Sequence, residues 1–203
     1  KPQYAWQNSW GFSTRSLGVM LAIHGDDKGL VLPPKIAPNK IVVVPILFKN
    51  KSEKVLKFSK DVFKKLKKCA PLFDDREGYS AGWKFNEWEL KGIPLRLEVG
   101  PRDVENKEVV LVRRDTGEKE FVKISKVSER VSSLLIEIQQ DMFDKAKKFL
   151  DGNIVSVKDI DSLKNAVDSG KIGKANWCGN PACETNIKDK TSAKSLNSSF
   201  DDK

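Results

Sequence analysis

The stretch QNSWGFSTRSLGVMLAIHGDDKGLVLPP, residues 7–34, changes character several times within a short length. A polar and aromatic start leads to Arg15, and the apolar segment that follows predicts a helix up to residue 24. The charged sequence GDDKG then predicts a turn, and two prolines end regular structure. The pattern therefore predicts a strand or turn followed by a helix, with Arg15 exposed at the junction, and a domain boundary near Pro38.

The segment WGFSTRSLG, residues 10–18, closely resembles the third signature motif of class II aminoacyl-tRNA synthetases. The form is that of the archaeal/eukaryotic-type prolyl-tRNA synthetases. In that family the motif arginine holds ATP and a neighbouring hydroxyl also contacts the nucleotide, so the resemblance assigns ATP binding to Arg15 and Ser13. A guanidinium suits this ligand because it stacks on a base and donates paired hydrogen bonds to phosphate oxygens. The resemblance implies that residues 1–38 are the C-terminal end of a catalytic domain.

The composition is compatible with contact with RNA but does not require it. The formal net charge of +9 over 203 residues attracts polyanions, although basic surfaces also serve solubility alone. No apolar run approaches the ~20 residues of a membrane span, and the chain does not start like a signal peptide. Three cysteines do not make a secreted disulfide framework, so we expect a reducing, cytoplasmic location. The one histidine, His24, excludes most Cys/His and Ser/His/Asp catalysis.

Residues 39–126 are expected to form an α/β domain with a mixed sheet. The pattern predicts a buried strand, an amphipathic helix, a short helix, a strand and a hairpin, over residues 41–48, 52–69, 83–92, 95–100 and 108–124. Pro45 within the first strand favours an edge or bulge position. The resemblance makes this the anticodon-binding domain.

Residues 127–203 are expected to form a small C-terminal α/β domain, which the resemblance identifies as the C-terminal prolyl-tRNA synthetase domain. The pattern predicts a long amphipathic helix from residue 128 to Gly152, with an apolar stripe reaching Phe149. A strand, a helix and a further short helix beyond Cys183 follow. We expect the polar tail from residue 192 to fray.

The stretch DDREGYSAGWKFNEWELKGIPLRLEVGPRD, residues 74–103, interleaves aromatic, basic and acidic residues. This combination suits splayed single-stranded bases, although composition alone favours a packed core that contains Trp83 and Trp88. The stretch closely resembles the anticodon-recognition segment of the same family. Proline codons begin CC, so the anticodon presents two guanines, whose donors suit a carboxylate and whose acceptors suit arginine. The family positions that contact these guanines match Phe85, Glu89, Arg96, Arg102 and Asp103.

A lysine-rich helical face extends from Lys54 to Lys68. Its members are Lys54, Lys57, Lys60, Lys64, Lys65, Lys67 and Lys68. A solvated helix surface is the expected role of these side chains. The alternative is non-specific contact with the backbone of the anticodon stem.

The sequence WCGNPACE contains Cys178 and Cys183, which resemble the first half of a four-cysteine zinc site in relatives. A structural zinc needs four tetrahedral ligands, and Asn197 lies at or near the position where relatives have a further cysteine. We therefore expect no zinc, and either two free thiols or a disulfide formed on oxidation. The sequence HGDDKG, which begins at His24, is expected to be a structural turn rather than a metal or acid–base site.

The resemblance implies part of an enzyme that joins proline to its tRNA through prolyl-adenylate, with ATP and magnesium, and whose parent is a homodimer. The first two class II motifs and the proline pocket are not recognisable here, so this chain alone is not expected to activate proline. Binding of proline tRNA is its expected activity. The alternative is a stand-alone RNA-binding or regulatory module with an anticodon-binding fold. The complete ATP motif at residues 7–18 argues against that alternative, because a module that only binds RNA has no need of it.

Overall fold

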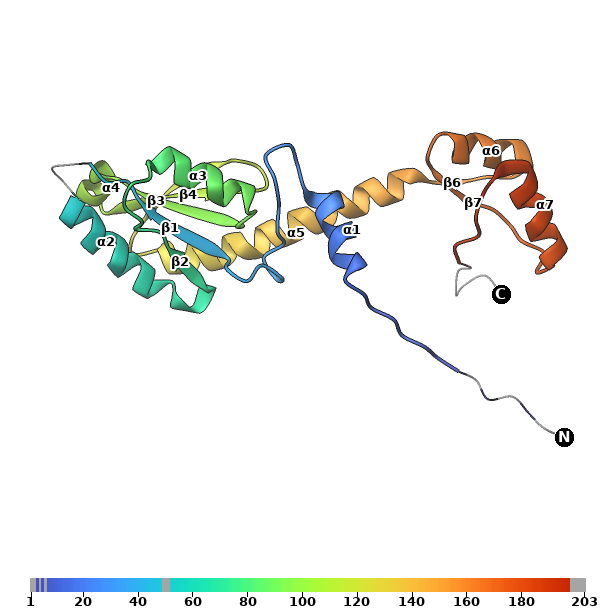
Figure 1. The fold of residues 1–203 in the computed structure, drawn as a ribbon, viewed down its shortest axis with the longest axis horizontal. Helices are drawn as coiled ribbons and strands as arrows, with labels where there is room; N and C mark the ends of the chain where they lie inside the picture. Colours follow the sequence, from blue (N-terminus) through green and yellow to red (C-terminus); the bar gives the residue numbers. More distant parts are fainter. Residues whose placement is uncertain (1–2, 4, 6, 49–51, 198–203) are drawn as a thin grey trace. The chain divides into compact units, whose positions relative to one another are not determined.

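The computed structural model describes residues 3, 5, 7–48 and 52–197, and the chain divides into two compact units, Lys1–Asp144 and Lys145–Lys203 (Figure 1). The elements up to the start of the second unit are α1 (Arg15–His24), β1 (Ile41–Pro45), α2 (Ser52–Lys65), the 3-10 helix η1 (Lys67–Cys69), β2 (Pro71–Phe73), α3 (Ala81–Leu90), β3 (Leu95–Val99), α4 (Pro101–Asn106), β4 (Glu108–Arg113), β5 (Lys119–Lys123) and α5 (Val127–Asn153). The boundary between the units falls within α5.

The first unit is built on a five-stranded sheet with the order β2-β1-β3-β4-β5. The strands β2, β1 and β3 are parallel, and β4 and β5 are antiparallel additions, so the predicted mixed sheet is confirmed. Strand β1 lies between two strands, but only Ile41–Val43 pair with β2, so Pro45 has an edge position on that side. Pro45 is accommodated because it is the last residue of β1, and the next amide, of Ile46, donates to the Val99 carbonyl at 2.8 Å.

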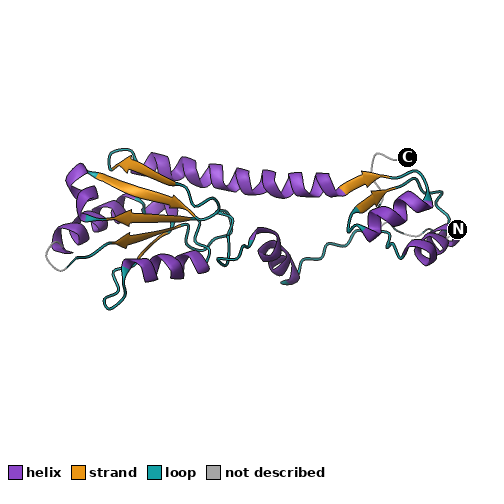
Figure 2. Ribbon diagram, turned by 90° about the horizontal axis from the view of Figure 1, so that it is seen from above, coloured by secondary structure: helices purple, strands orange, loops and turns teal. Residues whose placement is uncertain are grey.

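The two faces of the sheet are covered differently. On one face, β-branched and leucine side chains of β1, β3 and β4 form the main core with α2 and α5 (Figure 2). On the other face, Val42, Val44 and Ile93 form a smaller cluster under α3, against which Phe85 and Trp88 pack. Alternation along each strand sends successive side chains to opposite faces, so Arg96 and Glu98 of β3 lie on the face of α3.

The apolar stripe of α5 is shorter than the sequence predicts. Val131, Leu134, Ile138 and Met142 are buried in the main core, as expected. Phe149 lies in the part of α5 that belongs to the second unit and is 72% exposed, so its assignment to the stripe is wrong. The remaining elements of that unit are β6 (Ile154–Ser156), α6 (Ile160–Asp168), β7 (Ile172–Lys174) and α7 (Pro181–Thr191).

The second unit pairs β6 and β7 in parallel, with Leu163 and Ala166 of α6 buried. Helix α7 begins at Pro181 rather than beyond Cys183, because the Asn180 side chain accepts a hydrogen bond from the amide of Ala182 at 2.9 Å and caps the helix. The tail from residue 192 was expected to fray, and its residues 198–203 lie outside the described part of the chain. Residues 192–197 form no helix or strand.

Of the strand or turn expected before α1, the structure has a turn at Thr14, where the amide of Ser16 donates to the Ser13 carbonyl at 3.0 Å, and no strand over residues 7–13. Residues 7–13 form no regular structure, and Trp10 and Phe12 are almost fully exposed. A strand needs a neighbour to take its backbone hydrogen bonds, and no described segment pairs with these residues. The turn after α1 is confirmed by the bridge between Asp26 and Gly29. Among the described residues, no helix is long and apolar enough to cross a membrane.

Candidate nucleic-acid interface

Helix α3 places Phe85 and Glu89 one turn apart over the sheet. The helix begins where the Ser80 hydroxyl accepts a hydrogen bond from the amide of Trp83 at 3.2 Å. It ends before Gly92, whose positive φ of +72° reverses the chain into β3. The inner side of α3 packs on β1, and Phe85 also contacts Arg96 of β3.

Arg96 of β3 is stacked on Phe85. Its guanidinium carbon lies 4.5 Å from the centre of the Phe85 ring, and its Nη1 donates to the Phe85 carbonyl at 3.4 Å. Its Nε donates to Glu98 Oε1 at 2.9 Å, from the same face of the strand. An arginine has five N–H donors, so this arrangement fixes the guanidinium and leaves donors for a ligand. The partner Glu98 was not predicted, although alternation along a strand is the signal that could have identified it.

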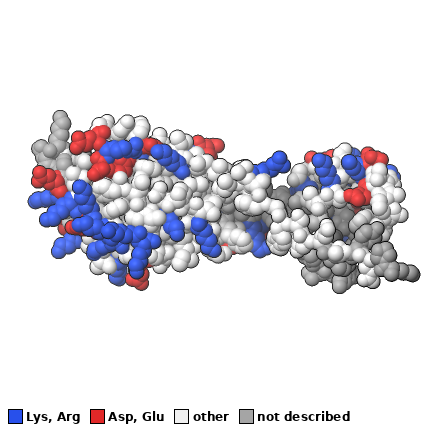
Figure 3. Space-filling view, turned by 60° about the horizontal axis from the view of Figure 1, so that its bottom comes forward, with Lys and Arg blue, Asp and Glu red and all other residues white. Residues whose placement is uncertain are grey.

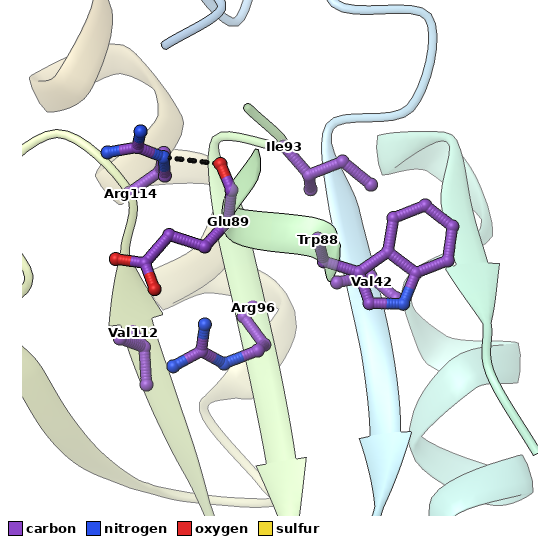
Figure 4. A pocket seen from close by; sticks show the side chains of 7 residues that line it. All are labelled: Val42, Trp88, Glu89, Ile93, Arg96, Val112 and Arg114. Atoms are coloured by element: carbon purple, nitrogen blue, oxygen red, sulfur yellow. Dashed lines mark hydrogen bonds between the residues drawn. The ribbon is translucent and has the colours of Figure 1, made fainter. Parts of the chain in front are cut away.

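Glu89 lies beside Arg96 (Figure 4) and contacts two further basic residues, Lys28 and Arg114, from turns elsewhere in the chain. Its Oε1 is 3.2 Å from Lys28 Nζ, and its backbone carbonyl accepts from Arg114 Nε at 2.7 Å. Arg114 also donates to both carboxylate oxygens of Asp26, at 2.8 and 2.6 Å. The hydrogen bonds from Arg114 lower the pKa of Asp26 to about 2 against the opposing effect of burial.

A small cavity of about 10 Å³ separates these groups, lined by Val42, Trp88, Glu89, Ile93, Arg96, Val112 and Arg114 (Figure 4). That volume holds about one water molecule. A base is too large for this cavity, so it has to meet the exposed parts of Glu89 and Arg96, whose side chains are 27% and 15% exposed.

Arg102 and Asp103 lie at the carboxyl end of β3, in the first turn of α4. Asp103 accepts a hydrogen bond from the amide of Gly100 at 2.6 Å and so holds the start of the helix. Arg102 is exposed. Within the described chain, no hydrogen bond or ion pair joins either residue to Phe85, Glu89 or Arg96. The structure therefore brings three of the five predicted residues together and leaves two at the strand end.

A buried network that the sequence did not predict anchors α3. Asp74 accepts from Arg76 at 2.9 and 2.8 Å and from Trp88 Nε1 at 2.7 Å, and the buried Lys84 donates to its carbonyl at 3.2 Å. Burial alone would raise the pKa of Asp74, but the hydrogen bonds from Arg76 and Trp88 outweigh it and hold the pKa well below its usual range. Asp74 directly follows β2, a three-residue strand that is too short to show a pattern in the sequence.

Trp83 is not a core residue. It is 46% exposed and stacks on Tyr79 with the ring centres 4.1 Å apart, while Arg76 lies over both rings. Trp88, in contrast, is half-buried and packs against the smaller cluster, as composition suggested. The side of α3 on which each tryptophan lies decides the difference.

The lysines of α2 and η1 are exposed and gather into one basic area of the surface (Figure 3). Lys64 Nζ lies 3.6 Å from Asp61 Oδ1, and Lys65 Nζ donates a hydrogen bond to the Ile124 carbonyl at 3.5 Å. Because α2 packs on the face of the sheet opposite α3, these lysines and Arg96 lie on opposite sides of the domain.

Ser13 and Arg15 stand at the start of α1 and are both exposed. Helix α1 buries none of its residues, and no hydrogen bond joins either side chain to another described residue. One hydroxyl and one guanidinium do not make a site for ATP with magnesium, because a nucleotide site needs further phosphate and metal ligands. These two residues therefore do not by themselves fit the nucleotide.

Cys178 and Cys183 lie together at the start of α7. The backbone amide of Asn180 and the thiol of Cys183 lower the pKa of Cys178, and the same thiol contact raises the pKa of Cys183. Across residues 3, 5, 7–48 and 52–197, no three His, Cys, Asp or Glu side chains converge as metal ligands. Two thiols do not supply the four ligands of a structural zinc, and the absence of zinc stays a prediction.

Comparisons with known proteins agree with this architecture. A family profile described as "Anticodon binding domain" matches residues 40–134, and one described as "Prolyl-tRNA synthetase, C-terminal" matches residues 160–203. A proline–tRNA ligase of Natranaerobius thermophilus is 47% identical over 193 residues, which are 94% of this chain and 40% of that protein. A proline–tRNA ligase of Oceanobacillus iheyensis is 45% identical over 195 residues, again covering 40% of that protein.

Among solved structures, the prolyl-tRNA synthetase of Cryptosporidium parvum complexed with L-proline and AMP superposes with a TM-score of 0.84 at 42% identity. The match covers 88% of this chain and 39% of that one. The chain thus spans about 40% of the length of the curated relatives that it matches.

Proposed function

Because the chain belongs to the prolyl-tRNA synthetase family and matches its C-terminal part, we propose that it is the anticodon-binding part of an enzyme that joins proline to its tRNA. The observation that carries this proposal is the group formed by Phe85, Glu89 and Arg96 within the segment that matches the anticodon-binding domain. These residues combine a stacked guanidinium with a carboxylate, and the side chains of Glu89 and Arg96 are both partly exposed.

The chemistry of this group suits guanine. The N1–H and N2–H donors of a guanine meet the Glu89 carboxylate, and its O6 and N7 acceptors meet the remaining donors of Arg96. Phe85 holds the Arg96 guanidinium flat. Arg102 and Asp103, at the end of β3, take the second guanine of the anticodon. A bidentate contact of this kind discriminates against the wrong base by ~1–3 kcal/mol.

The test compares anticodon stem-loop hairpins that differ at the two guanines. The 203-residue chain should bind the hairpin with both guanines more tightly than hairpins in which either guanine is replaced by adenine, as measured by fluorescence anisotropy at fixed salt. Equal affinity for all three hairpins would contradict the proposal.

The parent enzyme, in this proposal, is a cytoplasmic homodimer that forms prolyl-adenylate from proline and ATP with magnesium. Arg15 and Ser13 contribute nucleotide contacts there, together with parts of the enzyme that this chain does not contain. The chain alone should therefore give no proline-dependent ATP–pyrophosphate exchange above background. Clear exchange by the 203-residue chain would contradict this division of labour.

A further inference from the structure

Phe121 is an aromatic side chain displayed on an open part of the sheet. It lies at the middle of β5, the edge strand, and is 66% exposed. Single exposed apolar residues are common in proteins, and Phe143 of α5 is exposed to a similar degree, so exposure alone argues nothing. The position of Phe121 in the sheet is what distinguishes it.

The strand register places Phe121 on the same face as the candidate guanine-reading residues. Phe121 pairs with Val110, and Val110 pairs with Glu98, the partner of Arg96. Two strand spacings of ~4.8 Å separate Phe121 from Glu98, so the backbones of these two residues lie about 10 Å apart across the sheet. Val112, which lines the small cavity beside Glu89, is the diagonal neighbour of Phe121 across the β4–β5 pair.

Charge on β5 favours a polyanion at the same place. Lys119 and Lys123 are two residues on either side of Phe121, so alternation puts all three side chains on one face. Both lysines are exposed. Lys123 is held by Glu108 at 3.1 Å, whereas the described residues offer Lys119 no ion pair. An aromatic ring between two lysines on an open strand suits a stacked base with its flanking phosphates.

We propose that Phe121 is a stacking platform for an unpaired base of the anticodon loop that neighbours the two guanines, with Lys119 beside its phosphate. The inference rests on the proposed function, since it extends the surface of Glu89 and Arg96 across β4 to the edge of the sheet. Phe121 adds affinity through the face of a base and carries no information on base identity, because every base has a face that stacks.

The test uses the full 203-residue chain and the anticodon stem-loop hairpin. Phe121→Ala should weaken binding at least about fivefold, the change that corresponds to ~1 kcal/mol, the lower end of the contribution of one stacked base. Phe121→Trp should bind close to the unsubstituted chain, because it restores a stacking ring. Phe143→Ala is the matched control, since it removes an exposed phenylalanine from α5, on the other face, and it should leave affinity unchanged.

Modified hairpins identify the base. An abasic nucleotide is placed at each loop position beside the guanines in turn, and at one of them the penalty of Phe121→Ala should disappear, because the stacking partner is already missing. The preference for guanine should persist in Phe121→Ala. Circular dichroism checks that the variants remain folded.

The outcomes separate the two proposals. Suppose that the unsubstituted chain discriminates guanine and that Phe121→Ala binds the hairpin with the same affinity as the unsubstituted chain. The stacking role of Phe121 is then overturned, and the proposed function stands. If Phe121→Ala loses affinity equally with every abasic hairpin, or if Phe121→Trp is as weak as Phe121→Ala, stacking is also overturned. If the chain does not discriminate guanine at all, both proposals fail.

Discussion

Glu89 is the residue that best tests base recognition, because its replacement should disturb the fold least. Its carboxylate is partly exposed and pairs with Lys28, whereas Arg96 is held by Glu98 in a more buried position. Glu89→Ala should therefore lower affinity for the guanine hairpin and reduce its preference over the adenine hairpins by ~1–3 kcal/mol. Anisotropy titrations with both RNA types measure this.

The control for Glu89→Ala is Glu118→Ala on the β4–β5 turn, where the carboxylate accepts a hydrogen bond from the Thr116 hydroxyl at 3.3 Å. That variant should keep the preference for guanine. If folded Glu89→Ala discriminates the hairpins as the unsubstituted chain does, the role assigned to Glu89 is wrong.

Asp26 predicts a specific pH dependence. Its folded-state pKa of about 2 lies below the ordinary value of 3.8, because Arg114 donates to its carboxylate. A lowered pKa stabilises the fold above pH ~4, and this contribution is lost as the pH falls towards 2. Asp26→Asn should therefore make the free energy of unfolding less dependent on pH in that window.

Urea titrations at several pH values between ~2 and ~5 measure the effect of Asp26→Asn. Asp27→Asn is the matched control, since Asp27 is the exposed neighbour in the same turn. If Asp26→Asn and the unsubstituted chain lose stability in parallel, the contact with Arg114 does not contribute as described.

Helix α3 depends on the buried group around Asp74. Asp74→Ala removes the acceptor of Arg76 and Trp88 and leaves the ammonium of Lys84 buried without its counter-charge. Breaking a buried pair in this way costs about 3–5 kcal/mol. We expect that loss in the free energy of unfolding, measured by urea denaturation.

The adjacent substitution Asp75→Ala, at an exposed position, should change stability by less than about 0.5 kcal/mol. A similar loss for both variants would show that the anchoring of α3 is not specific to Asp74.

The end of α3 is tied to the segment after α1 through Gly92. Its φ is +72°, and a Cβ there would lie 2.5 Å from the Leu30 carbonyl oxygen. Gly117 in the β4–β5 turn has a similar φ of +76° but open space around it. Gly117→Ala should cost the ~1–2 kcal/mol of a left-handed alanine, and Gly92→Ala should cost clearly more.

Thermal and urea unfolding of the two glycine variants compare them directly. If both variants lose the same free energy of unfolding, the backbone of residues 30–32 moves away from the new methyl group at no cost. The close approach at Gly92 would then contribute little to stability.

At the scale of the molecule, the sheet separates two basic features. The lysines of α2 lie on one side and Arg96 on the other. Replacing Lys64 and Lys67 by alanine should therefore leave the preference for guanine unchanged. Any loss of affinity should be equal for all RNAs and should come with a smaller salt dependence, by about one counterion for each lysine that contacts phosphate. A changed guanine preference in this variant would contradict the separation.

The long elements of the fold could be predicted from the sequence, because their apolar patterns repeat over enough residues. The helices α2 and α5, the strand β3 and the β4–β5 hairpin follow from such repeats. The sequence did not predict the three-residue strands β2 and β7 or the six-residue helix α4. Neither the alternation of a strand nor the 3.6-residue repeat of a helix can be recognised over so few positions.

The site was predictable as a set of residues and not as an arrangement. The resemblance supplied Phe85, Glu89 and Arg96, which the fold brings together. The contact of Glu89 with Lys28 could not be assigned, because it depends on how α3 packs against a distant turn. Glu98, two residues from Arg96 on the same strand, was within reach of strand alternation. The exposure of Trp83 likewise depends on which side of α3 packs on the sheet.

The edge position of β5 also bears on self-association. An edge strand presents unpaired backbone groups to other chains, and an exposed phenylalanine there makes such pairing more favourable. Lys119 and Lys123 flank Phe121 on that strand, and the approach of a second β5 would bring these like charges together. Replacing both lysines by threonine, which suits a strand as well, should therefore increase concentration-dependent association in light scattering, and adding Phe121→Thr should reverse it. The two lysines that favour an RNA partner at this edge would then also be the residues that keep the chain from pairing with itself.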